Sequence, residues 1–421
     1  MPDSHQQGRT RYFRLNCSRR DKNAVLEMLC REGFDPVPAA GLDNVMQVSR
    51  QPVPLGASLA NYFGFIYIQD LSSMLPALWL APEPGDAVLD MCASPGGKTC
   101  QLSAMTSPRG IVVANEASST RLLTLRANAG RLNLFNTVTS GYPGQNMGQG
   151  LKGFSRILLD VPCSGWGTEN KNPGVKKIWT REKAASLTSL QRMLLESASR
   201  MLLPGGRLVY STCTTNEDEN EQQVRWACQE LGLKADDAGI DFFERLPAPD
   251  CHRSGPGMVR IFGARAGAQD FFMASLKAGQ KKIQVQDSAL KQDRNRQDML
   301  DWPEGVKPLK QGKLWVFQEN VFFVPDKAWQ YTLRNFRFQG TYVGRVKNTK
   351  FLLNPRARTL LPDAGDGPCF VCEDLDLVQG LVQGRSVSIE TGKTGMLGLY
   401  WNNLGLGWLK IRNRRGFWSD R

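Results

Sequence analysis

The alternation of hydrophobic and polar residues predicts two stretches of mixed α/β character. Over residues 9–50, RYFRLN and NVMQVS alternate like strands, and KNAVLEMLCREG has helical spacing and ends at Gly33. The aromatic segment YFGFIYIQDLSSMLPALWL predicts a strand that runs into a helix. From 84 to 277 apolar strand-like runs alternate with helical stretches, one of them over residues 181–203. This alternation predicts a parallel sheet with helices on both faces.

The last third of the chain has a different pattern. Residues 278–311 are polar and weakly periodic, which predicts a linker, and from residue 313 short strands and turns dominate, as in KLWVFQENVFFV, TYVGRVKN and MLGLYWNN. No internal repeat is visible. We therefore expect a small N-terminal α/β unit over 1–54, an α/β core over 55–277, a linker over 278–312 and a mostly-β region over 313–421.

Composition narrows the partners more than the fold. The net charge of +13 favours a polyanion, with nucleic acid first and an acidic membrane surface second. No run of 18 apolar residues and no signal-peptide pattern is present, so we expect a cytoplasmic protein without a membrane partner. Ten scattered cysteines then read as reduced thiols, and the CxxC pair Cys369 and Cys372 as two ordinary cysteines. With only two histidines, we expect neither a histidine-based catalytic site nor a metal site.

Two apolar runs of the core end beside a cysteine. The run over 157–159 stops at Asp160 and is followed by Cys163, and the run over 208–210 is followed by Cys213. Because ligands of open parallel sheets bind at the carboxyl ends of the strands, we expect these three residues to face one crevice. A single free cysteine is usually buried and inert, but two at strand ends beside an acid favour a reactive site.

The segment VLDMCASPGGKT predicts a cofactor loop between a strand and a helix. Gly96 and Gly97 allow the backbone to approach a ligand at the helix N-terminus, although a plain strand–helix turn is the alternative. Glu116, at the end of the next strand, is placed to hold two ribose hydroxyls. A nucleoside-type cofactor is therefore expected, while the absence of GxGxxG and of a phosphate-binding loop argues against a dinucleotide and against an ATPase.

A thiol, an acid and a nucleoside cofactor together suit methylation of carbon 5 of cytosine. That carbon is a poor nucleophile until a second nucleophile adds to carbon 6, and a thiolate both adds readily and leaves readily. An acid at ring nitrogen 3 and the exocyclic amine stabilises the developing charge. A second cysteine nearby has a role in the final release.

Five motifs carry a specific resemblance. YIQDLSSMLP, DMCASPGGKT, ILLDVPCSGWGT, LLPGGRLVYSTCTTNEDENE and FFMASLK, in this order over residues 55–277, resemble the Nop2/Sun family of RNA cytosine-5 methyltransferases. The resemblance implies a class I, Rossmann-like methyltransferase core and S-adenosyl-L-methionine as the cofactor. It implies that Cys213 is the nucleophile, that Cys163 helps release the product, and that Asp160 and Lys98 contact the cytosine. The residues it implies for cofactor binding are Cys92, Ala93, Ser94, Pro95, Gly96, Gly97, Lys98, Glu116 and Asp160.

Departures from the family pattern keep a second function open. The family usually has an aspartate after the third strand, where this chain has TVTSGYPGQN with Pro143 or a neighbour in its place, and QDFF replaces DGFF. A catalytically weak RNA-binding or ribosome-assembly factor on the same fold is therefore the alternative. Amino-group methyltransferases usually carry a (D/N)PPY-like turn, which is absent, and DNA cytosine-5 enzymes use the PC cysteine and do not need Cys213.

The C-terminal end resembles an RNA-binding PUA domain. The segment GLYWNNLGLGWLKIRNRRGFW places arginines, which bind phosphate, beside aromatics, which stack on unpaired bases or form a core: Arg412, Arg414 and Arg415 beside Trp408, Phe417 and Trp418. The basic loop KNPGVKK over 171–177 is the stronger candidate for an RNA contact near the target base. We expect a monomer that acts on RNA and not on DNA, with small-subunit ribosomal RNA as the substrate and transfer RNA left open.

Overall fold

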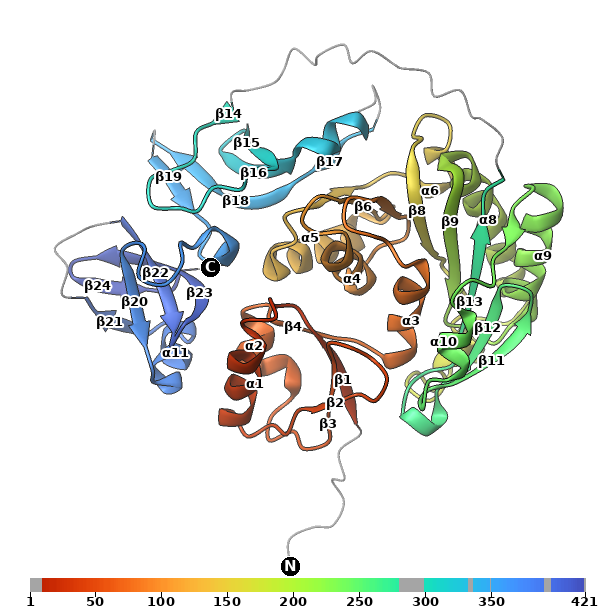
Figure 1. Cartoon of the computed structure of the whole chain (residues 1–421), viewed down its shortest axis with the longest axis horizontal. Coiled ribbons are helices and arrows are strands. Elements are labelled where there is room, and N and C mark those ends of the chain that lie inside the picture. The colour runs from red at the N-terminus through yellow and green to blue at the C-terminus, as the bar shows by residue number, and fades with distance from the viewer. Residues whose placement is uncertain (1–9, 280–298, 332–335, 349, 390–394, 420–421) are drawn as a thin grey trace, which may run out of the picture.

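The computed structural model describes residues 10–279, 299–331, 336–348, 350–389 and 395–419 of the 421-residue chain (Figure 1). Most of the predicted linker and the histidine at position 5 lie outside the described residues. Within the described ranges no helix is both long enough and apolar enough to cross a membrane. The described chain forms four sheets, of which one is the central sheet of the molecule.

The N-terminal unit is a four-stranded antiparallel sheet in the order β2-β3-β1-β4. Its alternating strands bury one face against the amphipathic helix α1, which ends before Gly33, a glycine at φ +86°. β4, which comes from the predicted aromatic strand, pairs with β1 and so joins this sheet. Its elements are β1 Arg11–Leu15, α1 Lys22–Arg31, β2 Val37–Pro38, β3 Val45–Val48, α2 Leu59–Tyr62 and β4 Ile66–Ile68.

The central sheet has ten strands, with the path β11-β12-β13-β9-β8-β5-β6-β7-β17 and β10 beside β13. Five strands run parallel as predicted: β5 Ala87–Asp90, β6 Ile111–Asn115, β7 Thr137–Ser140, β8 Phe154–Asp160 and β9 Leu202–Thr212. The other five pair antiparallel: β10 Lys234–Ala235, β11 Asp250–Gly255, β12 Met258–Phe262, β13 Phe271–Lys277 and β17 Phe338–Gln339. The predicted parallel sheet is therefore extended by antiparallel strands, because short connections join β11, β12 and β13 and leave no length for a crossover.

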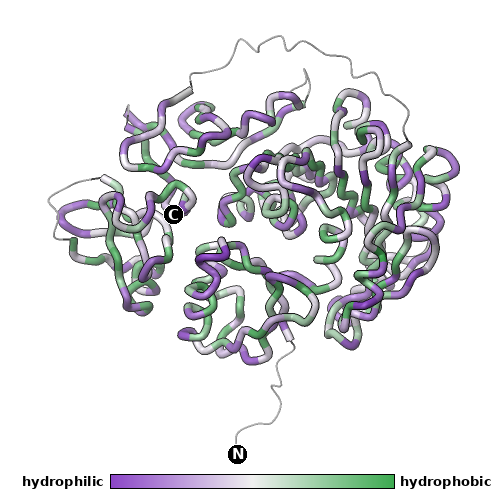
Figure 2. Tube along the Cα trace, in the orientation of Figure 1, coloured by the Kyte–Doolittle hydropathy of each residue, from purple (hydrophilic) through white to green (hydrophobic). Residues whose placement is uncertain are grey.

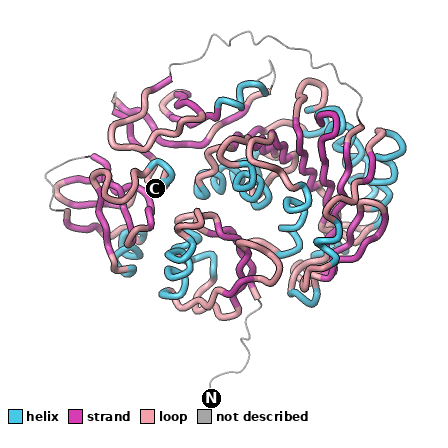
Figure 3. Tube along the Cα trace, viewed as in Figure 1, coloured by secondary structure: helices cyan, strands magenta, loops and turns pink. Residues whose placement is uncertain are grey.

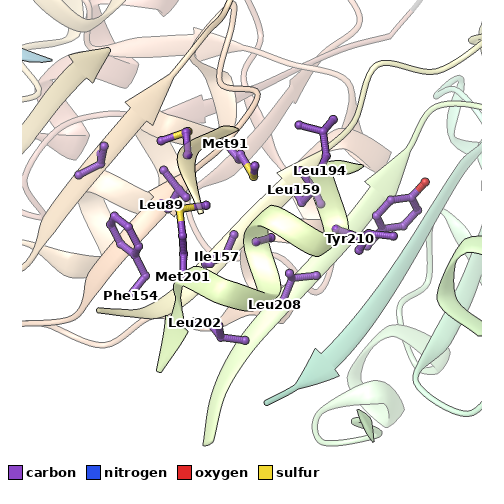
Figure 4. Close-up of a cluster of buried hydrophobic side chains, with 14 of the residues drawn as sticks. Leu89, Met91, Phe154, Ile157, Leu159, Leu194, Met201, Leu202, Leu208 and Tyr210 are labelled. Atoms are coloured by element: carbon purple, nitrogen blue, oxygen red, sulfur yellow. The ribbon is translucent and has the colours of Figure 1, made fainter. Parts of the chain in front are cut away.

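Helices cover both faces of this sheet. Strand β8 is buried on both sides. Ile157 and Leu159 belong to a hydrophobic cluster with α8 (Figure 4). Leu158, between them, belongs to the cluster under α3 on the opposite face. Hydrophobic residues run along the central strands in Figure 2, as expected for strands buried on both sides. The helices are α3 Leu71–Leu80, α4 Gly97–Thr106, α5 Ser119–Leu132, α6 Gly144–Met147, α7 Val175–Ile178, α8 Arg181–Met201, α9 Glu221–Glu230 and α10 Ile240–Glu244.

The C-terminal region is mostly strands and turns, as predicted (Figure 3). One five-stranded sheet contains β14 Met299–Leu300, β15 Gly312–Phe317, β16 Asn320–Pro325, β18 Thr341–Lys347 and β19 Lys350–Leu353. The other contains β20 Cys369–Cys372, β21 Ser386–Ser388, β22 Gly395–Trp401, β23 Leu404–Arg412 and β24 Arg415–Phe417, with the helix α11 Leu375–Val382.

Backbone pairing, hydrogen bonds and a shared hydrophobic cluster bind the C-terminal region to the rest of the chain. β17 pairs with β7 at the border of the central sheet, with Phe338 opposite Ser140. The Arg358 guanidinium donates to four backbone carbonyls, three of them in the N-terminal unit and one in α5: Asn16, Phe63, Gly64 and Arg131. The second C-terminal sheet also shares a hydrophobic cluster with α1 and α2. The three predicted stretches therefore pack together as one body.

Candidate active site

Two neighbouring strand ends bring the two predicted cysteines into contact. β8 and β9 are parallel partners in a register that pairs Asp160 with Ser211. The loops that follow carry Cys163 and Cys213, and their Sγ atoms lie 3.3 Å apart. Both cysteines are partly buried. The structure therefore places both thiols beside Asp160 at the carboxyl edge of the sheet.

The two thiols differ in acidity because they share a hydrogen bond. Either thiol can donate in this contact. With the proton on Cys163, the bond raises the pKa of Cys163 while it lowers the pKa of Cys213. The positive charge of Lys98 lowers the pKa of Cys213 further. The first thiolate of the pair therefore forms on Cys213, which is the reactive form of a cysteine.

Asp160 and Lys98 form a fixed ion pair next to the thiols. Lys98 Nζ donates to Asp160 Oδ2 at 2.7 Å and to Ser73 Oγ at 2.8 Å, and its side chain is only 11% exposed. Ser211 Oγ donates to the other carboxylate oxygen at 2.7 Å. Because both oxygens are held, the carboxylate keeps one orientation toward the space in front of the strands.

A buried carboxylate joins the loops that carry the cysteines. Glu219 is fully buried and accepts from the backbone N–H of Ser164 at 2.9 Å and from Gln191 Nε2 at 3.0 Å. Ser164 Oγ also lies 2.7 Å from Thr214 Oγ1, next to Cys213 in the chain. This network fixes the distance between the two loops, and therefore between the two thiols.

The predicted cofactor loop is held by its carbonyl groups. The carbonyl oxygens of Ser94, Pro95 and Gly97 accept from Arg121 at 2.9 Å, from Asn128 at 2.8 Å and from Arg14 at 2.6 Å, respectively. The first N–H groups of the following helix α4 have no partners within the helix. The loop therefore presents donors for a carboxylate or another anionic group.

The two glycines of the loop serve different purposes. Gly96 has φ +106°, a conformation that favours glycine. Gly97 faces β4, and a Cβ atom there would lie 2.6 Å from Tyr67 Cε1. The absence of a side chain at Gly97 is thus required by packing against the N-terminal unit, a reason that the sequence did not suggest.

Glu116 ends β6 within reach of the same loop. It is 5% exposed, and its Oε2 lies 3.5 Å from Arg121, which also binds the Ser94 carbonyl. Asp90, at the end of β5, has one buried oxygen without a hydrogen-bond partner among the described residues, and burial raises its pKa to about 7. A buried polar atom left without a partner fits a site that a polar ligand completes.

The end of β7 carries no carboxylate. Residues 141–143 are glycine, tyrosine and proline, and Asn115 holds this turn by accepting from the Tyr142 N–H at 3.0 Å and donating to its carbonyl at 2.8 Å. Residues 141–143 therefore offer no carboxylate where the family usually has an aspartate. The side-chain amide beside this turn is that of Asn115, and it is already bonded to the backbone of Tyr142.

Comparison with known proteins gives this arrangement a family. Residues 77–277 match the family described as 16S rRNA methyltransferase RsmB/F. The Ribosomal RNA small subunit methyltransferase F of Vibrio vulnificus is 30% identical over 440 residues, covering 97% of this chain and 90% of that protein. The protein of the same name from Vibrio campbellii is 31% identical, over 75% of this chain and 69% of its own length.

The chain belongs to the RsmB/F family of rRNA methyltransferases. A solved methyltransferase homologue from Pyrococcus horikoshii shares the fold, with a TM-score of 0.55 and 28% identity over 65% of this chain and 88% of that one. NSun6 from the same organism, solved with SFG, also has a TM-score of 0.55, over 65% of this chain and 91% of that one, at 22% identity. The Rossmann-like fold, the RNA methyltransferase activity and the cofactor S-adenosylmethionine are thereby confirmed.

Five residues that were not predicted from the sequence support the candidate active site. Arg14 holds the cofactor loop, Ser73 and Ser211 orient the ion pair, Asp90 borders the loop, and Glu219 joins the cysteine loops. Asp90 could have been found, because it ends a strand just as Asp160 does. Arg14 gave no signal, since an arginine in an alternating strand reads as a surface residue.

The predicted RNA contacts of this RsmB/F member have different surroundings. In the loop over 171–177, Lys176 pairs with Glu169 at 2.6 Å, and Lys177 is exposed. Trp408 and Trp418 are buried, so the core interpretation of these two tryptophans holds. The arginines expected beside them are exposed on β23, β24 and the turn between: Arg412, Arg414 and Arg415.

Proposed function

We propose that this chain transfers a methyl group to carbon 5 of a cytosine in small-subunit ribosomal RNA, through a covalent bond between Cys213 and carbon 6. The observation that carries the proposal is the 3.3 Å contact between Cys163 and Cys213 beside the Asp160–Lys98 pair. The name of the Vibrio relatives, Ribosomal RNA small subunit methyltransferase F, supports the class of substrate. The acidity of Cys213, rather than Cys163, supports the choice of nucleophile.

The first step is addition to the ring. The Cys213 thiolate forms a bond to carbon 6 and the double bond between carbons 5 and 6 opens, so that its electron pair spreads over carbon 5 and nitrogen 3. Asp160 accepts a hydrogen bond from the exocyclic amine, and the Lys98 ammonium stabilises the charge that develops at nitrogen 3. These two groups need no reorganisation, because the ion pair and Ser211 hold them beforehand.

The second step ends with release of the enzyme. S-adenosylmethionine would supply the methyl group: carbon 5 bonds to it with its electron pair, the methyl–sulfur bond breaks with its pair left on sulfur, and S-adenosylhomocysteine is the leaving group. The proton on carbon 5 then passes to water, its electron pair re-forms the double bond, and the bond from carbon 6 to sulfur breaks. Cys163 donates a hydrogen bond to the departing sulfur, as it does to Cys213 here, and so favours the thiolate as a leaving group.

The residues proposed to hold the cofactor surround the loop after β5. The N–H groups at the start of α4 suit the carboxylate of the methionine part, and Glu116 suits the ribose hydroxyls. The remaining proposed contacts are the backbone of residues 92–97, Lys98 and Asp160. We include residues 1–54 and the PUA-like part of 313–421 in this proposal as flanking RNA-binding units.

A covalent trap tests the mechanism. Cys163→Ala is expressed in bacterial cells beside the wild type, Cys213→Ala and the double variant, and lysates are run on denaturing gels with and without ribonuclease. Only Cys163→Ala should give a slow-migrating, ribonuclease-sensitive band, because its adduct forms but is not released. Sequencing the trapped RNA then identifies the cytosine. Absence of the band in folded, RNA-binding Cys163→Ala would refute the covalent mechanism.

A second candidate function is an RNA-binding or ribosome-assembly factor with weak catalysis. The turn over 141–143 favours it, because it offers no carboxylate to the adenine edge of the cofactor. Titration calorimetry with S-adenosylmethionine and a methyl-transfer assay on small-subunit RNA together separate the two functions. An active methyltransferase binds S-adenosylmethionine with micromolar affinity and transfers labelled methyl groups to small-subunit RNA, whereas the assembly factor binds the RNA but shows neither property.

A further inference from the structure

A pocket of about 350 Å³ lies between the central sheet and the first C-terminal sheet. Helix α5 and strand β7 form one wall, and β17, β18 and residues 354–356 form the other. None of its lining residues belongs to the candidate active site. The lining side chains that matter here are Arg126, Arg131, Thr139, Tyr342 and Arg356.

The lining of this pocket, which we call the arginine pocket, is positively charged. It includes three arginines and neither aspartate nor glutamate. Arg126 donates from Nε to Thr139 Oγ1 at 3.2 Å, and its two terminal nitrogens have no partner within the described part of the chain. Arg131 donates to carbonyl and amide oxygens of Asn61 and Asn128, and no described carboxylate pairs with it. Among the described residues, the pocket therefore offers the guanidinium groups of Arg126 and Arg131 without a paired acid.

Burial disfavours the charged form of Arg126 and Arg131, and Arg131 and Arg356 also repel one another. Burial lowers the pKa of Arg126. Burial also lowers the pKa of Arg131, and the positive charge of Arg356 lowers it further. A bound anion would remove this unfavourable charge density, and a phosphate fits best because guanidinium groups bind it through paired hydrogen bonds.

An aromatic ring stands beside these cations. Tyr342 is 36% exposed, and its ring meets Phe322 edge-on at 5.8 Å between centroids. An exposed ring beside arginines is the combination on which unpaired bases stack while their phosphates are neutralised. The volume lies at the small end of ligand pockets, which suits one nucleotide rather than a duplex.

We infer that the arginine pocket binds one nucleotide of single-stranded RNA, with its phosphate on Arg126 and Arg131 and its base against Tyr342. This rests on the proposed RNA substrate but not on the cysteine chemistry. The pocket would hold the RNA strand at a second point, away from the thiols, and so contribute affinity without contacting the reacting base. A free mononucleotide shares the same chemistry, and the experiment must distinguish the two.

Binding by the full chain tests the inference. The probe is a fluorescein-labelled, 12-nucleotide single-stranded RNA, measured by anisotropy over a range of potassium chloride concentrations. Arg126→Ala should weaken binding at least fivefold and lower the salt slope by about 0.7, the value for one phosphate contact on a single strand. Tyr342→Ala should weaken binding by about fivefold or more, the size of one stacked base. Arg245→Ala removes an equal charge from an 82% exposed side chain just after α10 and should change binding less than twofold.

Two further measurements keep the result independent of folding and of catalysis. The unaltered protein is irradiated with a 5-iodouridine RNA, and the adduct should map to the peptide that contains Tyr342. The readout is RNA binding and not methyl transfer, so failure of the cysteine mechanism would leave this test intact. Equal binding by Arg126→Ala, Tyr342→Ala and Arg245→Ala, or an adduct only elsewhere, would overturn the inference. So would displacement of the RNA by guanosine monophosphate at the same concentration as the probe.

Discussion

Removing the Cys163 thiol should make Cys213 less acidic. The two sulfur atoms share a hydrogen bond across 3.3 Å, and with Cys163 as its donor this bond is the largest cause of the lowered pKa of Cys213. The change Cys163→Ala deletes the donor, while desolvation and the charge of Asp160, both of which raise the pKa of Cys213, stay in place. The pKa of Cys213 should therefore rise.

The size of the rise follows from the strength of the bond. A hydrogen bond to a charged group contributes about 1.5–3 kcal/mol, and one pKa unit corresponds to about 1.36 kcal/mol. The pKa of Cys213 should then increase by about 1–2 units. At a fixed pH below the wild-type pKa, the fraction of thiolate falls by about ten- to a hundredfold, since a higher pKa leaves more thiol protonated.

Alkylation kinetics measure this change. The rate of reaction of Cys213 with iodoacetamide is followed from pH 5 to 10 by mass spectrometry of its peptide, so that the other cysteines do not interfere. Cys163→Ser, which keeps a donor, is the matched control and should recover part of the acidity. An unchanged or lower pKa of Cys213 in Cys163→Ala would refute the assignment of Cys163 as donor and Cys213 as thiolate.

Three other predictions concern the supports of the site. Arg14→Met loses the bond to the carbonyl of Gly97 and should weaken S-adenosylmethionine binding about tenfold in calorimetry, whereas Arg11→Met on the same strand, which is exposed, should not. Glu219→Gln replaces an acceptor of several buried hydrogen bonds and should lower the free energy of unfolding in urea by about 2 kcal/mol, with a parallel loss of activity. Arg358→Met removes a donor from four carbonyls and should lower the free energy of unfolding by about 3 kcal/mol, with an unchanged result contradicting its connecting role.

Much of the central sheet could be predicted because its strands are periodic and end on polar residues. The parallel order from β5 to β9 follows from alternation with helices, and the meeting of Cys163 with Cys213 follows from where β8 and β9 end. The direction of a strand could not be predicted where the connections are short, because FFMASLK has the same apolar character whether it runs parallel or antiparallel. β11 was missed because DCHRSG is too polar to read as a strand.

Contacts between residues far apart in the sequence could not be predicted either. Arg14 and Arg358 act on carbonyl groups far away in the chain, and no local pattern distinguishes them from surface arginines. Helical spacing in the sequence extends over residues 217–231, but α9 begins only after Asn220, whose side chain bonds to the Thr214 carbonyl, a competition that spacing does not reveal. Polar contacts between distant segments thus set the geometry of the site after the apolar pattern has set the sheet.

The short pairing of β17 with β7 has a consequence for the independence of the methyltransferase core. β7 is the last parallel strand on its side, and an uncovered strand presents unpaired N–H and C=O groups along which other sheets can add. Phe338 and Gln339 cover those groups, and Thr341 Oγ1 adds a bond to the Leu134 carbonyl at 3.0 Å. The family match ends at residue 277, yet the sheet is completed by residues well beyond it. A protein truncated after residue 277 would expose the unpaired edge of β7, to which other sheets could add. The methyltransferase core therefore depends on residues beyond the family match.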